Sequence, residues 1–248
     1  MRIGVISDIH GNIAALEAVL ADGDEVGLDA YVFLGDLVFF GLHPQQCFDA
    51  LLERSPLVCI KGNTDANLEE VGTFHPSSDF EKQLLEVLVD CDQHLSVEAK
   101  QEIASWPIST SKTLFGHHLL FCHGSPYHVS DKLVPDDTKC EVADRLEHET
   151  AELIFCGHTH MPGEFTIKGK HIVNVGAVGY SFDGDHRPSY AILEVDEEHL
   201  AIELRRVDYD HAGYRRELAQ MANELPLFSG ILYAIEHGKH QPMEKQKP

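Results

Sequence analysis

Short apolar runs alternate with longer amphipathic stretches over the first sixty residues. Three of these runs have the length of buried strands: residues 2–6, 31–34 and 57–60. The stretches between them have helical character: residues 12–22, where Ile13, Leu16, Val19 and Leu20 share one face, and residues 43–53, where Pro44 stands near the first turn. The order strand–helix–strand–helix–strand is typical of a parallel sheet covered by helices, so the pattern predicts an α/β fold.

The rest of the chain continues the same alternation of helices and strands. Residues 78–105 are helical in character, with a second short helix opening at Ser96, and a later helix is expected from about Tyr209 to Leu225. Further strands are expected at residues 113–115, 119–122, 153–155, 163–167, 171–175, 190–195 and 201–207. Residues 1–236 are therefore expected to form one domain, and residues 237–248 a loose polar tail.

The net charge limits the class of partner. With 19 basic and 41 acidic residues the formal charge is −22, and such a surface repels polymeric nucleic acid and anionic membranes. The chain contains no apolar run of about 18 residues, and its N-terminus turns polar too early for a signal peptide. We therefore expect a cytoplasmic protein that acts on a small phosphorylated substrate, with metal ions supplying positive charge. The sequence does not specify an oligomeric state.

Five short segments rich in Asp, Asn and His each follow an apolar run. They are Asp8-Ile9-His10, Gly35-Asp36, Gly62-Asn63-Thr64-Asp65, His123-Gly124 and Gly157-His158-Thr159-His160. In open α/β sheets ligands bind beyond the carboxyl ends of the strands, so these side chains are expected to converge. Residues i and i+2 of an extended segment point to the same side, which would let Asp8 and His10 face one ion.

The donor types favour a metal site with two ions. Carboxylate and imidazole without thiolate suit manganese, iron or zinc better than calcium. Seven candidate ligands are too many for one tetrahedral ion, and Asp36 is the natural carboxylate to bridge two. Taken singly the segments have ordinary explanations, since Asp8 and His10 could cap the following helix and Gly35-Asp36 is a common turn.

The order D-x-H, GD, GN, HG and GHTH resembles the calcineurin-like metallophosphoesterase family over roughly residues 1 to 195. The HGSP segment at 123–126 and NVGAVG at 174–179 are similar to its small prokaryotic branch of phosphoesterases and diadenosine-tetraphosphatase-like proteins. The resemblance implies a four-layer α-β-β-α sandwich, in which two facing mixed β-sheets are flanked by helices.

The resemblance also implies the roles of the site residues. One ion would take Asp8, His10, Asp36 and His160, and the other would take Asp36, Asn63, His123 and His158. Asn63 and His123 would be catalytic, and Asn63 would contact the substrate; Asn174 is also expected to contact the substrate, because it stands at the end of a predicted strand and could approach the site there. Two divalent ions, with manganese favoured over iron or zinc, would hold a bridging hydroxide that attacks the phosphorus of a phosphodiester or nucleotide.

One position departs from the family pattern. The histidine that usually follows GN, and that protonates the leaving group or steadies the transition state, is Thr64 here. Threonine does not deliver a proton near pH 7 as imidazole does, so either acidic leaving groups are favoured or another group such as His43 or His128 substitutes. Two alternatives stay open: a phosphomonoesterase or protein phosphatase on the same site, and a scaffold protein that keeps the fold with little turnover.

Overall fold

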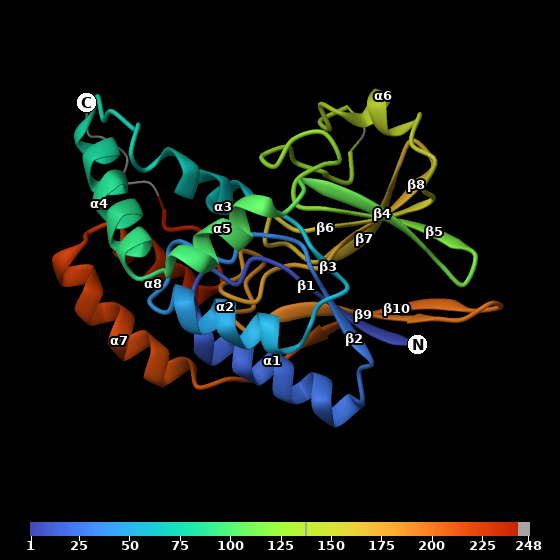
Figure 1. Ribbon diagram of the computed structural model, residues 1–248, viewed down its shortest axis with the longest axis horizontal. Helices are drawn as coiled ribbons and strands as arrows, with labels where there is room; N and C mark the ends of the chain where they lie inside the picture. The colour runs from blue at the N-terminus through green and yellow to red at the C-terminus, as the bar shows by residue number, and fades with distance from the viewer. Residues whose placement is uncertain (137, 243–248) are drawn as a thin grey trace.

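Two five-stranded β-sheets face each other in the computed structural model, which describes residues 1–136 and 138–242 (Figure 1). The first sheet has the order β10 (Leu200–Arg206), β9 (Ser189–Val195), β1 (Arg2–Ile6), β2 (Ala30–Phe33), β3 (Val58–Cys59). The second has the order β4 (Ser109–Leu114), β5 (His117–Cys122), β6 (Leu153–Cys156), β8 (Lys170–Asn174), β7 (Gly163–Ile167). Both sheets are mixed, as the family resemblance implied.

Each sheet contains three adjacent parallel strands, which are central in the second sheet and reach the edge at β3 in the first. In the first sheet β1, β2 and β3 are parallel, and in the second β5, β6 and β8 are parallel. Antiparallel neighbours complete the sheets: β9 and β10 in the first, β4 and β7 in the second. The loops that follow the parallel strands of the two sheets are joined by hydrogen bonds, so their carboxyl ends share one edge of the sandwich.

Strict alternation of apolar side chains explains why the central strands are buried on both faces. In β1, Ile3 and Val5 pack between the sheets with Phe121 and Phe155, whereas Ile6 faces the helices. The same two-residue period divides the side chains of β2, β5 and β9 between the two faces. Continuous apolar runs in the sequence are therefore strands covered on both sides.

Six helices cover the outer face of the first sheet: α1 (Ile13–Val26), α2 (Pro44–Glu53), α4 (Asp79–Gln93), α5 (Val97–Ser105), α7 (His211–Glu224) and α8 (Phe228–His237) (Figure 1). The side chains of Ser78 and Ser96 accept backbone N–H groups at the starts of α4 and α5, as N-caps do. The outer face of the second sheet carries a thinner layer, which includes the short helix α6 (Ala143–Leu146) and Leu133. This arrangement confirms the four-layer sandwich.

The observed elements differ from the sequence-based bounds in a few places. Helix α8 and the short segments α3 (Asn63–Asn67), η1 (Leu68–Glu70) and α6 were not predicted. Strand β4 begins at Ser109, four residues earlier than expected, because its alternating polar residues lie on a sheet edge and give no apolar signal. Within the described residues, no helix is both long and apolar enough to cross a membrane.

The C-terminal segment, residues 237–248, was predicted to be a loose tail. Its first residue, His237, is the last residue of α8, and the helix is capped by Gly238 with φ +61°. The Gly184 N–H donates to the Gly238 carbonyl, and the ring of His240 stacks on Phe182. Residues 243–248, the rest of the predicted tail, lie outside the described residues. The division into a domain of residues 1–236 and a tail stays a prediction.

Asp22 joins α1 to the first sheet, and we expect it to make stability depend on pH. Its carboxylate accepts two hydrogen bonds from Arg205 at 2.8 and 2.9 Å and one from the buried Tyr190 hydroxyl. The Arg205 hydrogen bonds hold the pKa of Asp22 below its usual range. Replacing Asp22 by Asn should lower the free energy of unfolding near pH 7 by about 1–2 kcal/mol, measured by urea denaturation.

The sign of the pH effect follows from the lowered pKa in the folded state. The stabilisation is complete above the unfolded-state pKa of about 3.9 and is lost as the pH falls through the folded-state pKa. The stability difference between the wild type and Asp22→Asn should therefore shrink at acid pH. Asp24 is the matched control, because it lies in α1 like Asp22 and pairs with Arg54 at the end of α2, but its side chain is exposed, so Asp24→Asn should have the smaller effect. Equal effects of the two substitutions would contradict this role.

Candidate metal centre

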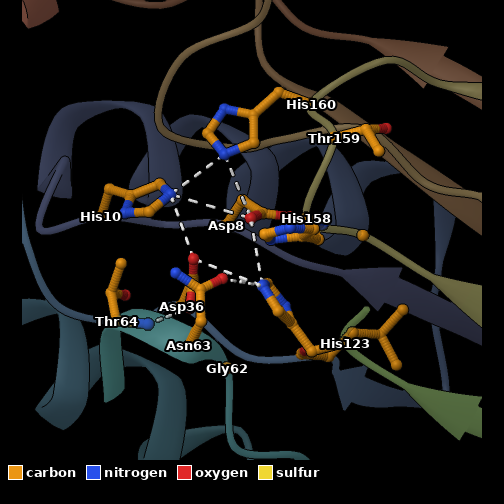
Figure 2. A network of polar contacts seen from close by, with 12 residues as sticks. Asp8, His10, Asp36, Gly62, Asn63, Thr64, His123, His158, Thr159 and His160 are labelled. Carbon is orange, nitrogen blue, oxygen red and sulfur yellow. Dashed lines mark hydrogen bonds and ion pairs between the residues drawn. The ribbon is translucent and has the colours of Figure 1, made fainter. Parts of the chain in front are cut away.

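The predicted ligands come from five segments, each of which follows a parallel strand within a few residues. Asp8 and His10 follow β1, Asp36 follows β2 and Asn63 follows β3 in the first sheet. From the second sheet, His123 follows β5, while His158 and His160 follow β6. Figure 2 shows the seven side chains gathered at the shared edge, as the sequence predicted.

The backbone at these positions is strained. Five of the residues have left-handed backbone conformations, with φ between 49° and 65°: Asp8, His10, Asp36, His158 and His160. The expectation that Asp8 and His10 lie in an extended segment is therefore wrong. Their side chains nevertheless converge on one point, as expected. A left-handed non-glycine residue costs about 1–2 kcal/mol, and clusters of such residues are found at functional sites.

Asp8, His10 and His160 form the first group of potential ligands. The Asp8 Oδ1 atom lies 3.1 Å from His160 Nε2 and 3.7 Å from His10 Nε2. The two Nε2 atoms are 3.1 Å apart. All three side chains are almost completely buried. The predicted ligand set of the first ion is thus assembled, with Asp36 beside it.

Asp36, His123 and His158 form the second group, with ligand atoms within 4.8 Å of one another. The Asp36 Oδ2 atom lies 3.3 Å from His123 Nε2 and also 3.7 Å from His10 Nε2 in the first group (Figure 2). The Asn63 Oδ1 atom lies 3.1 Å from His123 Nε2. One oxygen of Asp36 therefore faces both groups, where a bridging ligand must stand.

Backbone carbonyls fix which nitrogen of three histidines carries the proton. The Nδ1 atoms of His160 and His123 lie 2.6 Å from the Tyr180 oxygen and 2.9 Å from the Leu34 oxygen, and His10 Nδ1 contacts the Phe39 oxygen. A carbonyl oxygen only accepts, so Nδ1 carries a proton in each ring, and Nε2 is the nitrogen that faces the centre. This second layer of contacts is characteristic of metal-binding imidazoles.

Two observations show that the residues fit divalent cations. The Asp8 Oδ1 atom is buried and has no hydrogen-bond partner within the described part of the chain. The Nε2 lone pairs of His10 and His160 point at each other across 3.1 Å, which is repulsive unless a cation or proton lies between them. Ligand atoms about 2.1 Å from one ion are about 3.0–3.4 Å apart, close to the separations seen here.

The electrostatics of the cluster also favour a cation. Burial alone would raise the pKa of Asp8, but His160 and His123 outweigh it and hold that pKa well below its usual range. Burial would lower the pKa of His123, yet the charges of Asp36 and Asp8 raise it to about 9. The two buried carboxylates thus attract positive charge strongly.

Asp65 positions the bridging carboxylate, a role that was not assigned from the sequence. Its carboxylate accepts the backbone N–H groups of Asp36, Leu37 and Gly62 at 2.8–2.9 Å. Its place three residues after Gly62, at the third position of the short helix α3, is the capping-box position that signals such a contact. The Asp36 Oδ1 atom in turn accepts the Thr64 N–H, which leaves Oδ2 for the metal groups.

Two glycines are required because the carboxylates pack against bare backbone. A Cβ on Gly62 would lie 2.0 Å from Asp36 Oδ1, and one on Gly157 would lie 2.5 Å from Asp8 Oδ2. These separations are far below van der Waals contact, so any side chain at either position would displace a predicted ligand.

Asn174 lies beside the centre but has other partners. Its amide nitrogen donates to the Gly157 carbonyl and the Thr159 hydroxyl, and its oxygen accepts the Gly176 N–H. These contacts give it the role of positioning the loop that carries His158 and His160. A contact between Asn174 and substrate stays a prediction.

The residues considered as substitutes for the missing histidine have partners of their own. The Thr64 hydroxyl donates to the Val38 carbonyl at 2.8 Å. His43 pairs with Glu217 of α7, and the His128 ring accepts the Ser130 N–H. Tyr180, by contrast, stacks on the His10 ring with centroids 4.8 Å apart and supports the first group.

Comparison with known proteins agrees with this geometry. The chain is 31% identical to an uncharacterised protein of Methanocaldococcus jannaschii, over 92% of this chain and 95% of that protein. It is 24% identical to a probable metallophosphoesterase of Bacillus subtilis, over 92% of this chain and all of that protein. A crystal structure of a metallophosphoesterase from Sphaerobacter thermophilus superposes with a TM-score of 0.77 at 27% identity, covering 96% of this chain and 99% of that one.

The family match extends over most of the chain and includes all seven predicted ligands. Residues 1–198 match the calcineurin-like phosphoesterase superfamily domain, and this range contains the residues that the fold brings to one edge. The protein therefore belongs to the calcineurin-like phosphoesterase superfamily, a group of phosphoester hydrolases.

Proposed function

We propose that this protein is a phosphoesterase dependent on two divalent cations, with a phosphodiester or a nucleotide as substrate. The observation that carries the proposal is the Asp36 Oδ2 atom, which lies within 3.7 Å of a ring nitrogen in each ligand group. The donor set of carboxylate, amide and imidazole, without thiolate, favours manganese, with iron or zinc as alternatives. We propose that Asp8, His10, Asp36 and His160 hold one cation, and Asp36, Asn63, His123 and His158 the other.

Bound cations supply Lewis acidity, which withdraws charge from phosphoryl oxygens and makes water ionise near neutral pH. The chain's own contribution is rigid placement. Carbonyl contacts fix the rings of His10, His123 and His160, and Asp65 fixes the loop that carries Asp36. Because these donors are ordered before substrate arrives, little reorganisation is needed when charge develops on the phosphoryl group.

Asn63 and His123 lie together at the second ligand group, where we propose that the substrate phosphate binds. The Asn63 amide oxygen faces His123 Nε2, so its amide nitrogen remains available as a donor toward a phosphoryl oxygen. His123 is fully buried and its Nδ1–H donates to the Leu34 carbonyl, so the orientation of its ring is fixed. We propose that both groups position the phosphate for attack.

We further propose that the protein acts in the cytoplasm on small molecules. All six cysteines are free thiols and five are buried, which is typical of a reducing compartment. The charge of −22 disfavours polymeric nucleic acid as substrate and fits a small phosphate compound drawn to a locally cationic site.

Hydrolysis of bis(p-nitrophenyl) phosphate with added Mn²⁺ tests the proposed reaction. The wild type should release p-nitrophenolate, and chelation should abolish the release. Asp36→Asn should lower kcat/KM at least about 100-fold, because one oxygen serves both cations, and should lower the bound Mn²⁺ measured by elemental analysis. Asp79→Asn changes an exposed carboxylate on α4 and is the matched control.

The alternatives predict other results in the same assay. A faster rate on p-nitrophenyl phosphate than on the diester would favour a phosphomonoesterase. Binding of two Mn²⁺ without turnover of either compound would favour a scaffold protein. Full activity of Asp36→Asn would exclude the proposed bridging role.

Thr64→His tests the departure from the family pattern. The Thr64 hydroxyl donates to Val38, so it offers no proton to a leaving group, and we expect the wild type to prefer acidic leaving groups such as p-nitrophenolate. An imidazole at residue 64 should raise kcat on an alkyl phosphodiester about 10- to 100-fold, and change p-nitrophenyl ester hydrolysis much less. Thr64→Val, which removes the hydroxyl but adds no acid, is the control. If Thr64→His leaves the ratio of kcat on the alkyl diester to kcat on the p-nitrophenyl ester unchanged, leaving-group protonation does not limit turnover.

A further inference from the structure

A pocket of about 530 Å³ opens beside the candidate metal centre and is not used by the chemistry proposed above. Its lining includes His158, which belongs to the second ligand group, and then runs outward past Met161, Phe182 and His240. Its size is in the range of sites for small organic ligands. The pocket is therefore adjacent, through His158, to the place where the phosphate of a substrate is proposed to bind.

The lining of the pocket is mainly apolar and aromatic. Leu133, Val134, Pro135, Pro162 and Phe165 contribute apolar surface. Met161 exposes 54% of its surface although it is a large apolar residue. Exposed apolar surface concentrated next to a polar centre is characteristic of a ligand site. A flat apolar group is the chemistry that this lining fits.

A column of aromatic rings connects the ligand group to the pocket. Phe182 stacks on His160 with centroids 4.8 Å apart and an interplanar angle of 18°. His240 continues the stack on Phe182 with centroids 3.5 Å apart and an angle of 20°. The Phe182 N–H also donates to the His160 carbonyl, which ties the column to the metal-site loop. Stacked planar rings are the usual platform for a nucleobase.

The C-terminal segment supplies the last ring of this column. Helix α8 ends at Gly238, whose left-handed backbone turns the chain, and the Gly184 N–H anchors the Gly238 carbonyl. His240 is thereby held at the pocket, some eighty residues after His158 and His160 in the chain. The segment expected to be a loose tail thus contributes a ring to the pocket.

We propose that this pocket binds the nucleobase of a nucleotide substrate, with the His240 ring as its stacking surface and Phe182 as the ring that supports His240. The proposal rests on the proposed function, because it places the phosphate of the same compound at the metal centre. It narrows the substrate class from phosphoesters in general to those that carry a heteroaromatic base.

Calorimetric titration of the Mn²⁺-supplied protein with AMP and with ribose 5-phosphate tests the proposal. The two compounds share sugar and phosphate and differ only in the base. AMP should bind about tenfold more tightly than ribose 5-phosphate, as expected for one stacked base. Chromatography after each titration establishes that the compounds are intact. Adenosine against ribose gives the same comparison without phosphate.

Variants of the two rings should reduce the preference for AMP. In Phe182→Leu and in His240→Ala the affinity ratio should fall toward one, whereas a general disturbance of the centre would weaken both compounds together. Phe182→Leu keeps apolar bulk, and thermal melting shows whether each variant is folded. His237→Ala is the matched control, since this exposed histidine lies in the same segment outside the pocket lining and should retain the ratio.

The outcomes separate this inference from the proposed function. Equal affinity for AMP and ribose 5-phosphate in the wild type, together with no preference for adenosine over ribose, would overturn the base pocket even if phosphodiesters are hydrolysed. A ratio unchanged in both ring variants would overturn the assignment of Phe182 and His240. A tenfold ratio that both variants lose, in a protein that hydrolyses no phosphoester, would support the pocket and refute the proposed reaction.

Discussion

The arrangement of the whole molecule depends on two buried carboxylates that require positive charge. Asp8 and Asp36 are at most 2% exposed, and charges so far from water are tolerated only with strong partners. Their partners are imidazoles delivered by the second sheet, across the gap between the layers. The attraction therefore joins the two sheets at one edge, and divalent cations placed there would strengthen it.

The remaining features of the edge hold these groups in place. Left-handed backbone at five of the predicted ligands is unfavourable by itself and persists because neighbouring loops are tied together by hydrogen bonds. Bare backbone at Gly62 and Gly157 allows the carboxylates to approach closely, and Asp65 clamps the loop after β2. Electrostatic catalysis requires side chains that are held in place before the ligand binds. The strained backbone at these positions is therefore consistent with a functional site.

Much of the fold and most of the site could be predicted from the sequence because both leave short-range signals. Apolar runs of four to six residues mark strands buried on both faces, and ligands directly follow them. Strand β4 and α8 were poorly predicted because their surroundings determine them: β4 is a polar edge strand, and α8 packs on α7. The role of Asn174 as a loop support and the place of His240 depend on contacts between distant segments, which leave no pattern in neighbouring residues.

The position of β1 in the first sheet affects how the protein folds during synthesis. This strand lies between β2, which follows within about 25 residues, and β9, whose Glu194 pairs with Arg2. During synthesis one edge of the N-terminal strand therefore stays unpaired until β9, which ends at Val195, has left the ribosome. Contacts of such high sequence separation slow folding. An N-terminal fragment that ends before His158 would contain β1, Asp8 and His123 but would lack His160, the imidazole nearest to Asp8, so the group of Asp8, His10 and His160 is complete only once the second sheet has formed.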